Sequence, residues 1–152
     1  APSMASSAVD KTRKEQIRYA KESGSLSADA FAARKADFQN QGCWVGPAGC
    51  RKPFPYNTFD WSDDGCSPPT PEYLRQRFRN PCVQHDFGYR NFGKGLTLGR
   101  TESDRARIDN KFRTEMWAVC ARSFSGRART VCRAEASTMW AAVRTFNDWR
   151  ER

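Results

Sequence analysis

The fold and the chemistry of this chain turn on residues 81–91, which read PCVQHDFGYRN and contain its single histidine. Asn80 can cap a helix there, and Pro81 suits the first helical position because its missing N–H would have no partner. Histidine exchanges protons near neutral pH without special tuning, so His85 is the first candidate for chemistry. Helical steps of three and four residues make neighbours of four side chains: Cys82, His85, Asp86 and Tyr89.

Further helical patterns precede this stretch. The sequence predicts one short helix at about residues 9–22, whose thin apolar stripe is formed by Val9, Ile17 and Ala20, and a second from a Ser27 cap to Asn40. A third short helix is predicted from Pro71 to Arg79. The Gly-, Pro- and Asp-rich segment between the second and third helices predicts a long irregular connection.

Two longer helices are predicted after the histidine. Thr101, with Asp104 three residues later, resembles a capping box, and an apolar stripe continues from Ile108. The last helix is predicted over residues 127–149, and its expected inner side comprises Val131, Met139, Ala142, Phe146 and Trp149. No stretch alternates as a strand would. We therefore expect a single all-α domain over residues 1–152, in which two long antiparallel core helices carry the candidate residues His85 and Asp109.

The six cysteines indicate a disulfide framework. They lie 7, 16, 16, 38 and 12 residues apart, whereas zinc sites favour cysteine pairs with about two to four intervening residues. An even set of cysteines in a small chain is typical of an oxidising compartment. No stretch approaches the roughly 20 apolar residues of a membrane span. We expect a secreted protein, free or associated with a cell wall, whose Ala1 remains after signal-peptide cleavage.

The positive charge of the chain lies mainly in its second half. The net charge is +9, and residues 71–152 hold 17 Lys and Arg against nine Asp and Glu. Such an excess suggests an anionic partner, either a phospholipid surface or a nucleic acid. The alternative is a solvated surface that only keeps the protein soluble. Because we find no nucleic-acid-binding motif, we expect no nucleic-acid partner.

Asp86 and the upstream Asp64 are candidate metal ligands. If Cys82 pairs with Cys66, the loop at residues 63–66 lies against the first turn of the histidine helix and the two carboxylates approach each other. With a loop carbonyl they form a set of hard oxygen ligands that suits Ca²⁺. Two alternatives remain open: Asp86 forms a surface ion pair with Arg90 one turn later, or the aspartates of residues 60–64 only form turns.

Asp109 is a candidate partner for the histidine. It lies at the edge of the apolar stripe, and a buried aspartate needs a partner. The His85 ring and the Tyr89 hydroxyl, on a facing helix, are the natural ones. A His–Asp pair fixes the tautomer and stabilises the imidazolium that forms when the histidine takes a proton. The alternative is a salt bridge to Arg105 or Arg113 on the same helix.

Three separated motifs stand out in the chain: DWSxDxC at residues 60–66, CxxHDFGYRN at 82–91 and RIDxxF at 107–112. Together, and in this order, they strongly resemble the secreted phospholipase A2 family of bacteria and fungi. The resemblance is strongest over residues 59–146 and leaves residues 1–55 as an N-terminal extension. The chain lacks the CCxxHDxCY motif and the glycine-rich calcium loop of the animal and venom enzymes, so it resembles the microbial branch.

The resemblance implies hydrolysis of the sn-2 ester of a glycerophospholipid. His85 would be the catalytic base that activates a water, Asp109 its orienting catalytic partner, and Tyr89 a support for both. The family also implies a Ca²⁺ site of three residues: Asp64 and Asp86 through their carboxylates, and Gly65 through its main-chain carbonyl. The sequence itself favours a water nucleophile over a serine, because it contains no Gly-x-Ser-x-Gly elbow. We expect a monomer in peripheral contact with a membrane.

The resemblance further implies two disulfides, Cys66 with Cys82 and Cys120 with Cys132. Cys43 and Cys50 are then left to pair with each other.

Two other functions compete with the enzyme hypothesis. One is a catalytically inactive relative that binds a lipid or a receptor. The candidate catalytic and metal-binding side chains are all present, which argues against this function: His85, Asp109, Asp64 and Asp86. The other is a cationic membrane-active protein that acts by charge alone. Calcium dependence separates the enzyme from the cationic protein.

Overall fold

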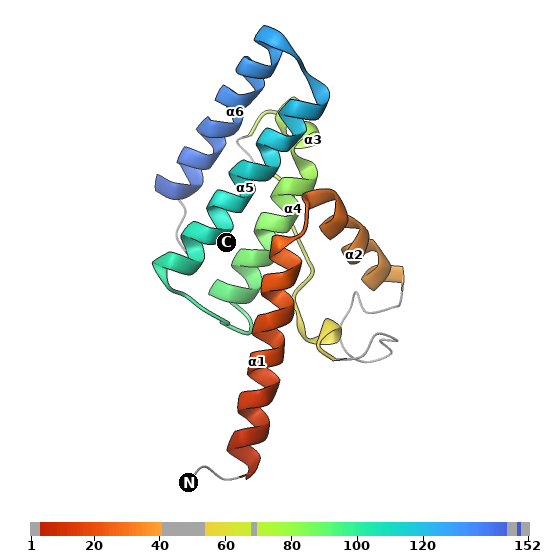
Figure 1. Ribbon diagram of the computed structural model, residues 1–152, viewed down its shortest axis with the longest axis vertical. Helices are drawn as coiled ribbons and strands as arrows, with labels where there is room; N and C mark the ends of the chain where they lie inside the picture. Colours follow the sequence, from red (N-terminus) through yellow and green to blue (C-terminus); the bar gives the residue numbers. More distant parts are fainter. Residues whose placement is uncertain (1–3, 41–53, 68–69, 146–148, 150–152) are drawn as a thin grey trace.

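The computed structural model describes residues 4–40, 54–67, 70–145 and 149, and these ranges form an all-α fold without strands (Figure 1). A 3₁₀ turn, η1 (Tyr56–Thr58), precedes the site, and a π-helical turn, η2 (Tyr89–Gly93), continues α4. The α-helices are α1 (Met4–Ser25), α2 (Ala28–Asn40), α3 (Glu72–Arg77), α4 (Arg79–Gly88), α5 (Glu102–Ser123) and α6 (Gly126–Thr145). The predicted fold class is confirmed.

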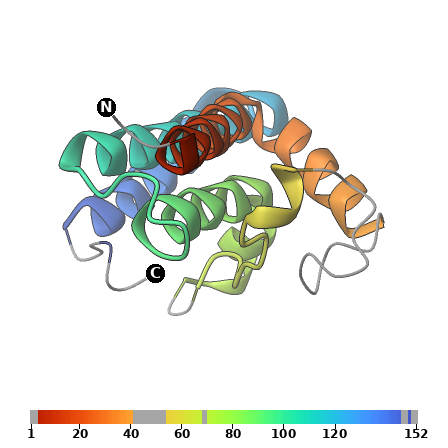
Figure 2. The same cartoon turned by 90° about the horizontal axis from the view of Figure 1, so that it is seen from below.

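Helix α4 is the central element, with α1, α2, α3 and α5 packed around it. It runs antiparallel to α5, and α6 turns back along α5 (Figure 1). Figure 2 looks along α1, which lies across α4 and α5. The Cys120–Cys132 disulfide joins α5 to α6. Helix α4, which carries the predicted histidine, therefore lies at the centre of the packing.

An aromatic cluster fixes the loop before Cys66 onto α4. The buried ring of Trp61 lies 4.8 Å from that of Phe87, and the Phe31 ring of α2 lies 5.1 Å from Phe87. Asn91, which is fully buried, adds a polar tie: its side-chain amide donates to the Asp60 carbonyl and accepts from the Asp60 N–H, both at 2.9 Å. Packing and hydrogen bonds thus set the position of this loop.

A second core cluster contains the Cys66–Cys82 and Cys120–Cys132 disulfides and residues from helices α3 to α6. Four of its members have no exposed surface: Phe78, Met116, Cys120 and Ala136. This cluster holds α6 against α5 from Cys132 to Val143, so the C-terminal end of α6 lies along α5.

Helix α1 is longer than the predicted helix at residues 9–22. Its N-terminal half projects beyond the rest of the molecule (Figure 1), and Val9, expected on the apolar stripe, is 65% exposed. Ala20 is buried, as predicted. The predicted Ser27 cap of α2 is confirmed, since its hydroxyl oxygen accepts the Ala30 N–H at 3.1 Å.

The start and length of α4 differ from the prediction. The helix begins at Arg79, and Phe78 occupies the cap position. Asn80 lies inside the first turn, where its amide donates to Asp29 at 2.9 Å instead of capping the helix. α4 spans only 10 residues rather than forming a long helix, and η2 extends its path to Gly93. The predicted Thr101 cap of α5 is confirmed by the Asp104 N–H, 3.0 Å from its hydroxyl.

The inner face of α6 was predicted one position out of phase. Val131 is 52% exposed and Ala142 is exposed, whereas Cys132, Ala136 and Val143 are buried. The disulfide explains the difference, because it turns the face that carries Cys132 toward α5.

The rest of that predicted face has a mixed outcome. Met139 packs against the second core cluster as expected, and Phe146 lies outside the described residues. Trp149 is buried beyond the end of α6, with its ring 4.9 Å from that of Tyr89. A Cβ at Gly93 would lie only 2.2 Å from the Trp149 ring, so glycine is required for this close approach.

Candidate active site

His85 and Asp109 form a buried pair between α4 and α5. The His85 Nε2 lies 2.7 Å from Asp109 Oδ1, and the two residues are 2% and 0% exposed. Because an ionised carboxylate only accepts hydrogen bonds, Nε2 carries the hydrogen and donates it. The tautomer this selects has its lone pair on Nδ1, the nitrogen that can accept a proton.

Gly88 brings the two helices close enough for this pair. A Cβ at Gly88 would lie 2.8 Å from a methyl carbon of Ile108, the residue before Asp109. Any larger residue at this position would push α5 away from α4. The glycine that follows the His-Asp-Phe sequence thus has a packing role.

Tyr89 supports the pair from one helical turn beyond His85. Its hydroxyl donates to Asp109 Oδ1 at 2.7 Å, and its ring lies 4.5 Å from the imidazole. Burial, followed by the negative charge of Asp109, raises the pKa of Tyr89 well above its ordinary value. Tyr89 therefore stays protonated and acts as a hydrogen-bond donor.

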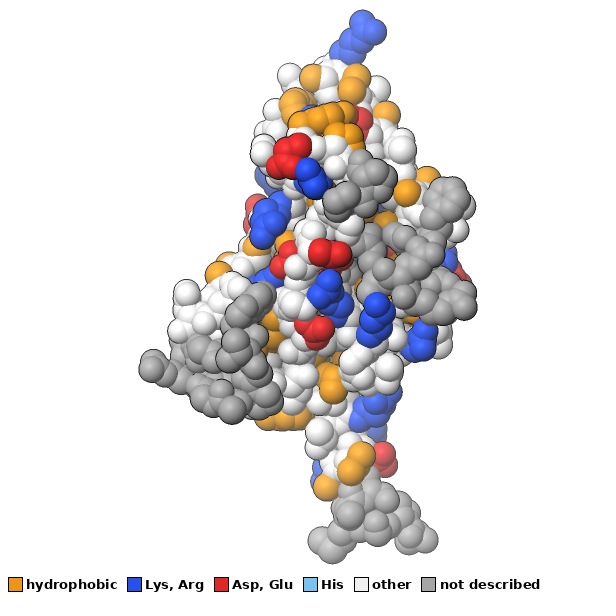
Figure 3. Space-filling model, turned by 180° about the vertical axis from the view of Figure 1, so that it is seen from behind, with side chains coloured by type: hydrophobic (Ala, Val, Ile, Leu, Met, Phe, Trp, Pro, Cys, Tyr) orange, Lys and Arg blue, Asp and Glu red, His pale blue; other side chains and the backbone are white. Residues whose placement is uncertain are grey.

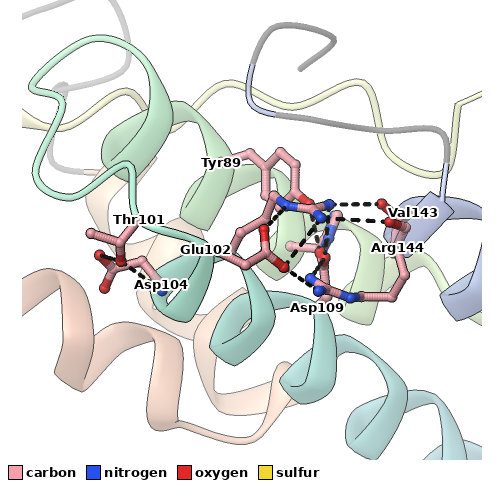
Figure 4. A network of polar contacts seen from close by, with 9 residues as sticks. Tyr89, Thr101, Glu102, Asp104, Asp109, Val143 and Arg144 are labelled. Carbon is pink, nitrogen blue, oxygen red and sulfur yellow. Dashed lines mark hydrogen bonds and ion pairs between the residues drawn. The ribbon is translucent and has the colours of Figure 1, made fainter.

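The Asp109 carboxyl remains ionised although it is fully buried. Burial alone would raise its pKa, but the hydrogen bonds from His85, Tyr89 and Arg144 hold the pKa below its ordinary value. Arg144 Nη1 donates to Asp109 Oδ2 at 2.8 Å (Figure 4). The carboxylate thus accepts hydrogen bonds on both oxygens.

The salt-bridge alternative for Asp109 holds in part. Arg105, one turn earlier on α5, lies 3.6 Å from Asp109 Oδ2, alongside the contacts to His85 and Tyr89. The Arg113 guanidinium lies over the Trp140 ring, 4.2 Å from its centroid. The two predictions for Asp109, a His–Tyr partnership and an arginine salt bridge, therefore both hold, since its carboxylate binds the histidine, the tyrosine and arginines together.

The structure also brings the two candidate metal ligands together. Asp86 is 1% exposed on α4, and its Oδ2 accepts the main-chain N–H of Asp64 at 3.1 Å. The Asp64 side chain is 57% exposed and lies 3.4 Å from Arg90, the residue considered as a partner for Asp86. Burial alone would raise the pKa of Asp64, but the Ser67 hydroxyl, which donates to its carboxylate, and the positive charge of Arg90 lower it.

The neighbouring aspartates form turns, as the alternative reading of residues 60–64 predicted. Asp60 Oδ1 accepts the Ser62 N–H at 2.9 Å, and Asp63 Oδ1 accepts the Gly65 N–H at 2.9 Å. Gly65 has a φ of +62°, a conformation that side-chain-bearing residues rarely adopt. The Cys66–Cys82 disulfide then ties the loop to the first turn of α4.

These residues fit a Ca²⁺ site. Two adjacent carboxyl groups repel each other when both are ionised, and a divalent cation between them relieves that repulsion. The described part of the chain contains no cluster of three or more His, Cys, Asp or Glu side chains. Main-chain carbonyls and water would therefore complete the coordination, and Gly65 directly follows Asp64.

A cleft of about 610 Å³ opens between α1, α4 and α5, and His85 is one of its lining residues. Its apolar wall includes Ala20, Phe87, Phe92, Ile108 and Phe112. Its basic side chains are Lys21, Arg107 and Lys111. The size and lining are typical of a site for a small, largely apolar ligand.

Sequence reasoning missed Arg144 and the contribution of α1. Arg144 is 35 residues from Asp109, so no local spacing connects them. Ala20 and Gly24 of α1 line the cleft, although the N-terminal segment carried no recognisable motif. The Cys66–Cys82 and Cys120–Cys132 disulfides are present as the resemblance implied, and Cys43 and Cys50 lie outside the described residues.

Comparisons with known proteins show what this chain is similar to. A fungal protein named "Secretory phospholipase A2" from Beauveria bassiana is 34% identical over 97 residues, or 63% of this chain and 48% of the relative. Another of the same name from Arthroderma benhamiae is 34% identical over 93 residues, or 59% and 60%. The chain thus spans about half the length of these curated relatives. The model of a family described as prokaryotic phospholipase A2 matches residues 18–147, so this chain belongs to that family.

Proposed function

We propose that this protein is a secreted, calcium-dependent phospholipase A2 that hydrolyses the sn-2 ester of glycerophospholipids. One observation carries the proposal: the buried His85–Asp109 pair, 2.7 Å apart, forms part of the wall of an apolar cleft. Membership of the family and the names of the two fungal relatives support the same reaction.

In the proposed reaction, His85 acts as a general base. Nδ1 takes a proton from a water molecule while Nε2 keeps its hydrogen bond to Asp109. The resulting hydroxide attacks the carbonyl carbon of the ester, and the Asp109 carboxylate stabilises the imidazolium. His85 then returns the proton to the leaving oxygen as the ester bond breaks. The products are a fatty acid and a lysophospholipid, with no acyl-enzyme.

The carboxylates of Asp64 and Asp86 and the main-chain carbonyl of Gly65 would hold the Ca²⁺ ion. When bound, Ca²⁺ supplies positive charge for the developing oxyanion and for the substrate phosphate. Asp86 is buried and directly follows His85, so the proposed cation site and the proposed base would share α4.

The cleft suits an acyl chain, because Phe87, Phe92 and Phe112 line it near His85. We propose that the enzyme meets its substrate by peripheral contact with a lipid surface. Within the described residues, no helix has the length and apolar character to cross a bilayer. On the face in Figure 3, Lys and Arg side chains are interspersed with Asp and Glu, so this face offers no unbroken basic patch.

Secretion is supported by two observations. The Cys66–Cys82 and Cys120–Cys132 disulfides suit an oxidising compartment, and both curated relatives are named secretory. A monomeric state, the absence of a nucleic-acid partner and cell-wall association stay predictions.

The proposal is tested by release of labelled fatty acid from a phospholipid labelled at the sn-2 position, with Ca²⁺ or with a chelator. The matched variant is His85→Gln, whose amide nitrogen keeps a donor for Asp109 but cannot accept a proton. Substrate labelled at sn-1 controls for positional selectivity, and thermal melting controls for folding.

We expect calcium-dependent sn-2 release by the wild type and none above background by folded His85→Gln. Release that survives in the variant would exclude His85 as the base. Lipid binding without release would support an inactive binding relative, and membrane disruption indifferent to Ca²⁺ would support a cationic membrane-active protein.

A further inference from the structure

Arg144, in the last turn of α6, reaches the site from outside the helix pair that carries His85 and Asp109. Its Nη1 lies 2.8 Å from Asp109 Oδ2, and its side chain is only 23% exposed. Figure 4 shows this guanidinium beside the carboxylate, with Tyr89 close to the same group. None of the three sequence motifs includes this residue.

The contacts divide the two oxygens of the Asp109 carboxylate between different donors. Oδ1 accepts from His85 and from Tyr89, each at 2.7 Å. Oδ2 accepts from Arg144 and also lies 3.6 Å from Arg105. A carboxylate held at one oxygen alone can rotate about its Cβ–Cγ bond, whereas donors on both oxygens fix the plane of the group.

Arg144 is itself held in place from two sides. Its Nη2 forms an ion pair with Glu102 in the first turn of α5. Arg105, which also binds Glu102, donates to the main-chain carbonyls of Val143 and Arg144 at 3.2 and 3.5 Å (Figure 4). These carbonyls belong to the last turn of α6, where carbonyl groups lack partners within the helix. Arg105 thus fastens the end of α6 to α5.

We propose that Arg144 is a positioning residue for the reaction: it fixes the Asp109 carboxylate so that Oδ1 holds the His85 ring in one orientation and one tautomer. This inference rests on the proposed function of His85. Helix α6, which contains none of the predicted catalytic or metal-binding residues, thereby becomes part of the catalytic arrangement. Glu102 and Arg105 act indirectly: they bind the side chain and the main chain of Arg144 and so keep it in place.

The guanidinium suits this task better than an ammonium would. Its planar fork binds Asp109 with one nitrogen and Glu102 with the other, which a single ammonium point charge cannot do with the same fixed geometry. Arg144 and Arg105 also offset the charges of Asp109 and Glu102, so the buried carboxylate is stabilised without an excess of either sign.

The test compares Arg144→Gln and Arg144→Lys with a matched control, Arg77→Gln. Arg77 also has a largely buried side chain, 19% exposed, and forms an ion pair with Glu135 of α6 at 2.9 Å, but it contacts none of the proposed site residues. Loss of a contact that merely holds α6 would therefore affect both glutamine variants alike. Melting temperatures are measured for all three variants.

We expect kcat of Arg144→Gln to fall on the order of 100-fold, the effect that a misplacement of about 1 Å can have. KM should stay within about twofold of the wild-type value, because the lost interaction orients the base and does not bind substrate. Arg144→Lys should recover part of kcat, and Arg77→Gln should match the wild type. Equal kcat values for Arg144→Gln and Arg77→Gln would overturn the proposal.

A second measurement keeps the inference independent of activity. Because the chain has one histidine, ¹⁵N-histidine labelling gives a single imidazole spectrum. At one fixed pH, we expect Arg144→Gln to shift the Nε2-bound proton signal and Arg77→Gln to leave it unchanged. If the wild type fails to release fatty acid, the proposed function fails while this spectrum still decides the role of Arg144. An unchanged Nε2-bound proton signal in Arg144→Gln would contradict the positioning role of Arg144.

Discussion

The two halves of the proposed site share α4 but are built in different ways. His85 and Asp109 are buried on two packed helices, and both oxygens of the carboxylate accept hydrogen bonds. Asp86 is equally buried, yet Asp64 lies on a loop with 57% of its side chain exposed. The loop is held by the Cys66–Cys82 disulfide and by hydrogen bonds that its N–H groups donate to Asp86 of α4 and Asn91 of η2.

This difference indicates how the site comes to be ready for reaction. The proton-handling half is organised by the fold itself, because its donors and acceptors are already paired. The cation half brings two carboxyl groups together, and a bound ion would complete it. Mutations should therefore separate the two halves, and the predictions below run from the largest expected effect to the smallest.

The largest effect is expected for Asp109→Asn in the proton-handling half. The amide can no longer accept the Nε2 hydrogen in the same way, so kcat should fall on the order of 10³- to 10⁴-fold. Calcium affinity, measured by titration calorimetry, should stay at the wild-type value. If calcium affinity falls as well, the two halves are not independent.

Loss of either the Cys66–Cys82 or the Cys120–Cys132 disulfide should have the next largest effect, and the two losses should affect the halves of the site differently. Cys66→Ser/Cys82→Ser and Cys120→Ser/Cys132→Ser should each cost about 3 kcal/mol of unfolding free energy, measured with urea, because the closed loops are similar in length. Only the first pair should raise the Ca²⁺ concentration needed for half-maximal activity, since only that disulfide ties the Asp64 loop to α4. The same rise in both variants would contradict a specific role for the loop tether.

Asp86→Asn tests the cation half directly. Loss of one carboxylate charge should weaken calcium binding by at least about tenfold, measured by calorimetry. The imidazole signal of His85 in the calcium-free protein should not shift, because its hydrogen bond goes to Asp109. A shifted signal would mean that Asp86 helps to orient the ring.

The smallest effect concerns stability in acid. The pKa of Asp109 is lowered in the folded protein, so this group contributes stability that is present above the ordinary carboxyl pKa. That contribution is lost as pH falls through the folded-state pKa. Urea midpoints should therefore decline less steeply below about pH 4 in Asp109→Asn than in the wild type. Asp64, whose pKa is also lowered, keeps its own contribution in both proteins.

The sequence could predict the His85–Asp109 contact because both residues lie on helices with clear patterns. Asp109 borders an apolar stripe, and His85 and Tyr89 share a helical face one turn apart. The Asp64–Asp86 approach followed from a loop expected to lie against the first turn of the same helix. These predictions needed only local periodicity and one tertiary contact.

The role of Arg144 could not be predicted in this way. Its contact with Asp109 depends on the turn between α5 and α6 and on the rotation that Cys132 gives α6. The predicted phase of α6 relied on Val131, which proved exposed, because apolar residues also occur on solvent-facing surfaces. The predicted Asn80 cap was wrong because α4 begins two residues earlier, at Arg79, with the buried Phe78 at the cap position.

The hydrogen bonds between Asn91 and Asp60 resemble the pairing between neighbouring β-strands. One side-chain amide meets both the N–H and the carbonyl of a single residue, as an adjacent strand would. In a ladder, such pairing fixes the register. The segment from Asp60 to Cys66 is therefore anchored at both ends, by Asn91 and by the disulfide. Its length is fixed as a result, because one inserted or deleted residue would move Asp64 out of line with Asp86.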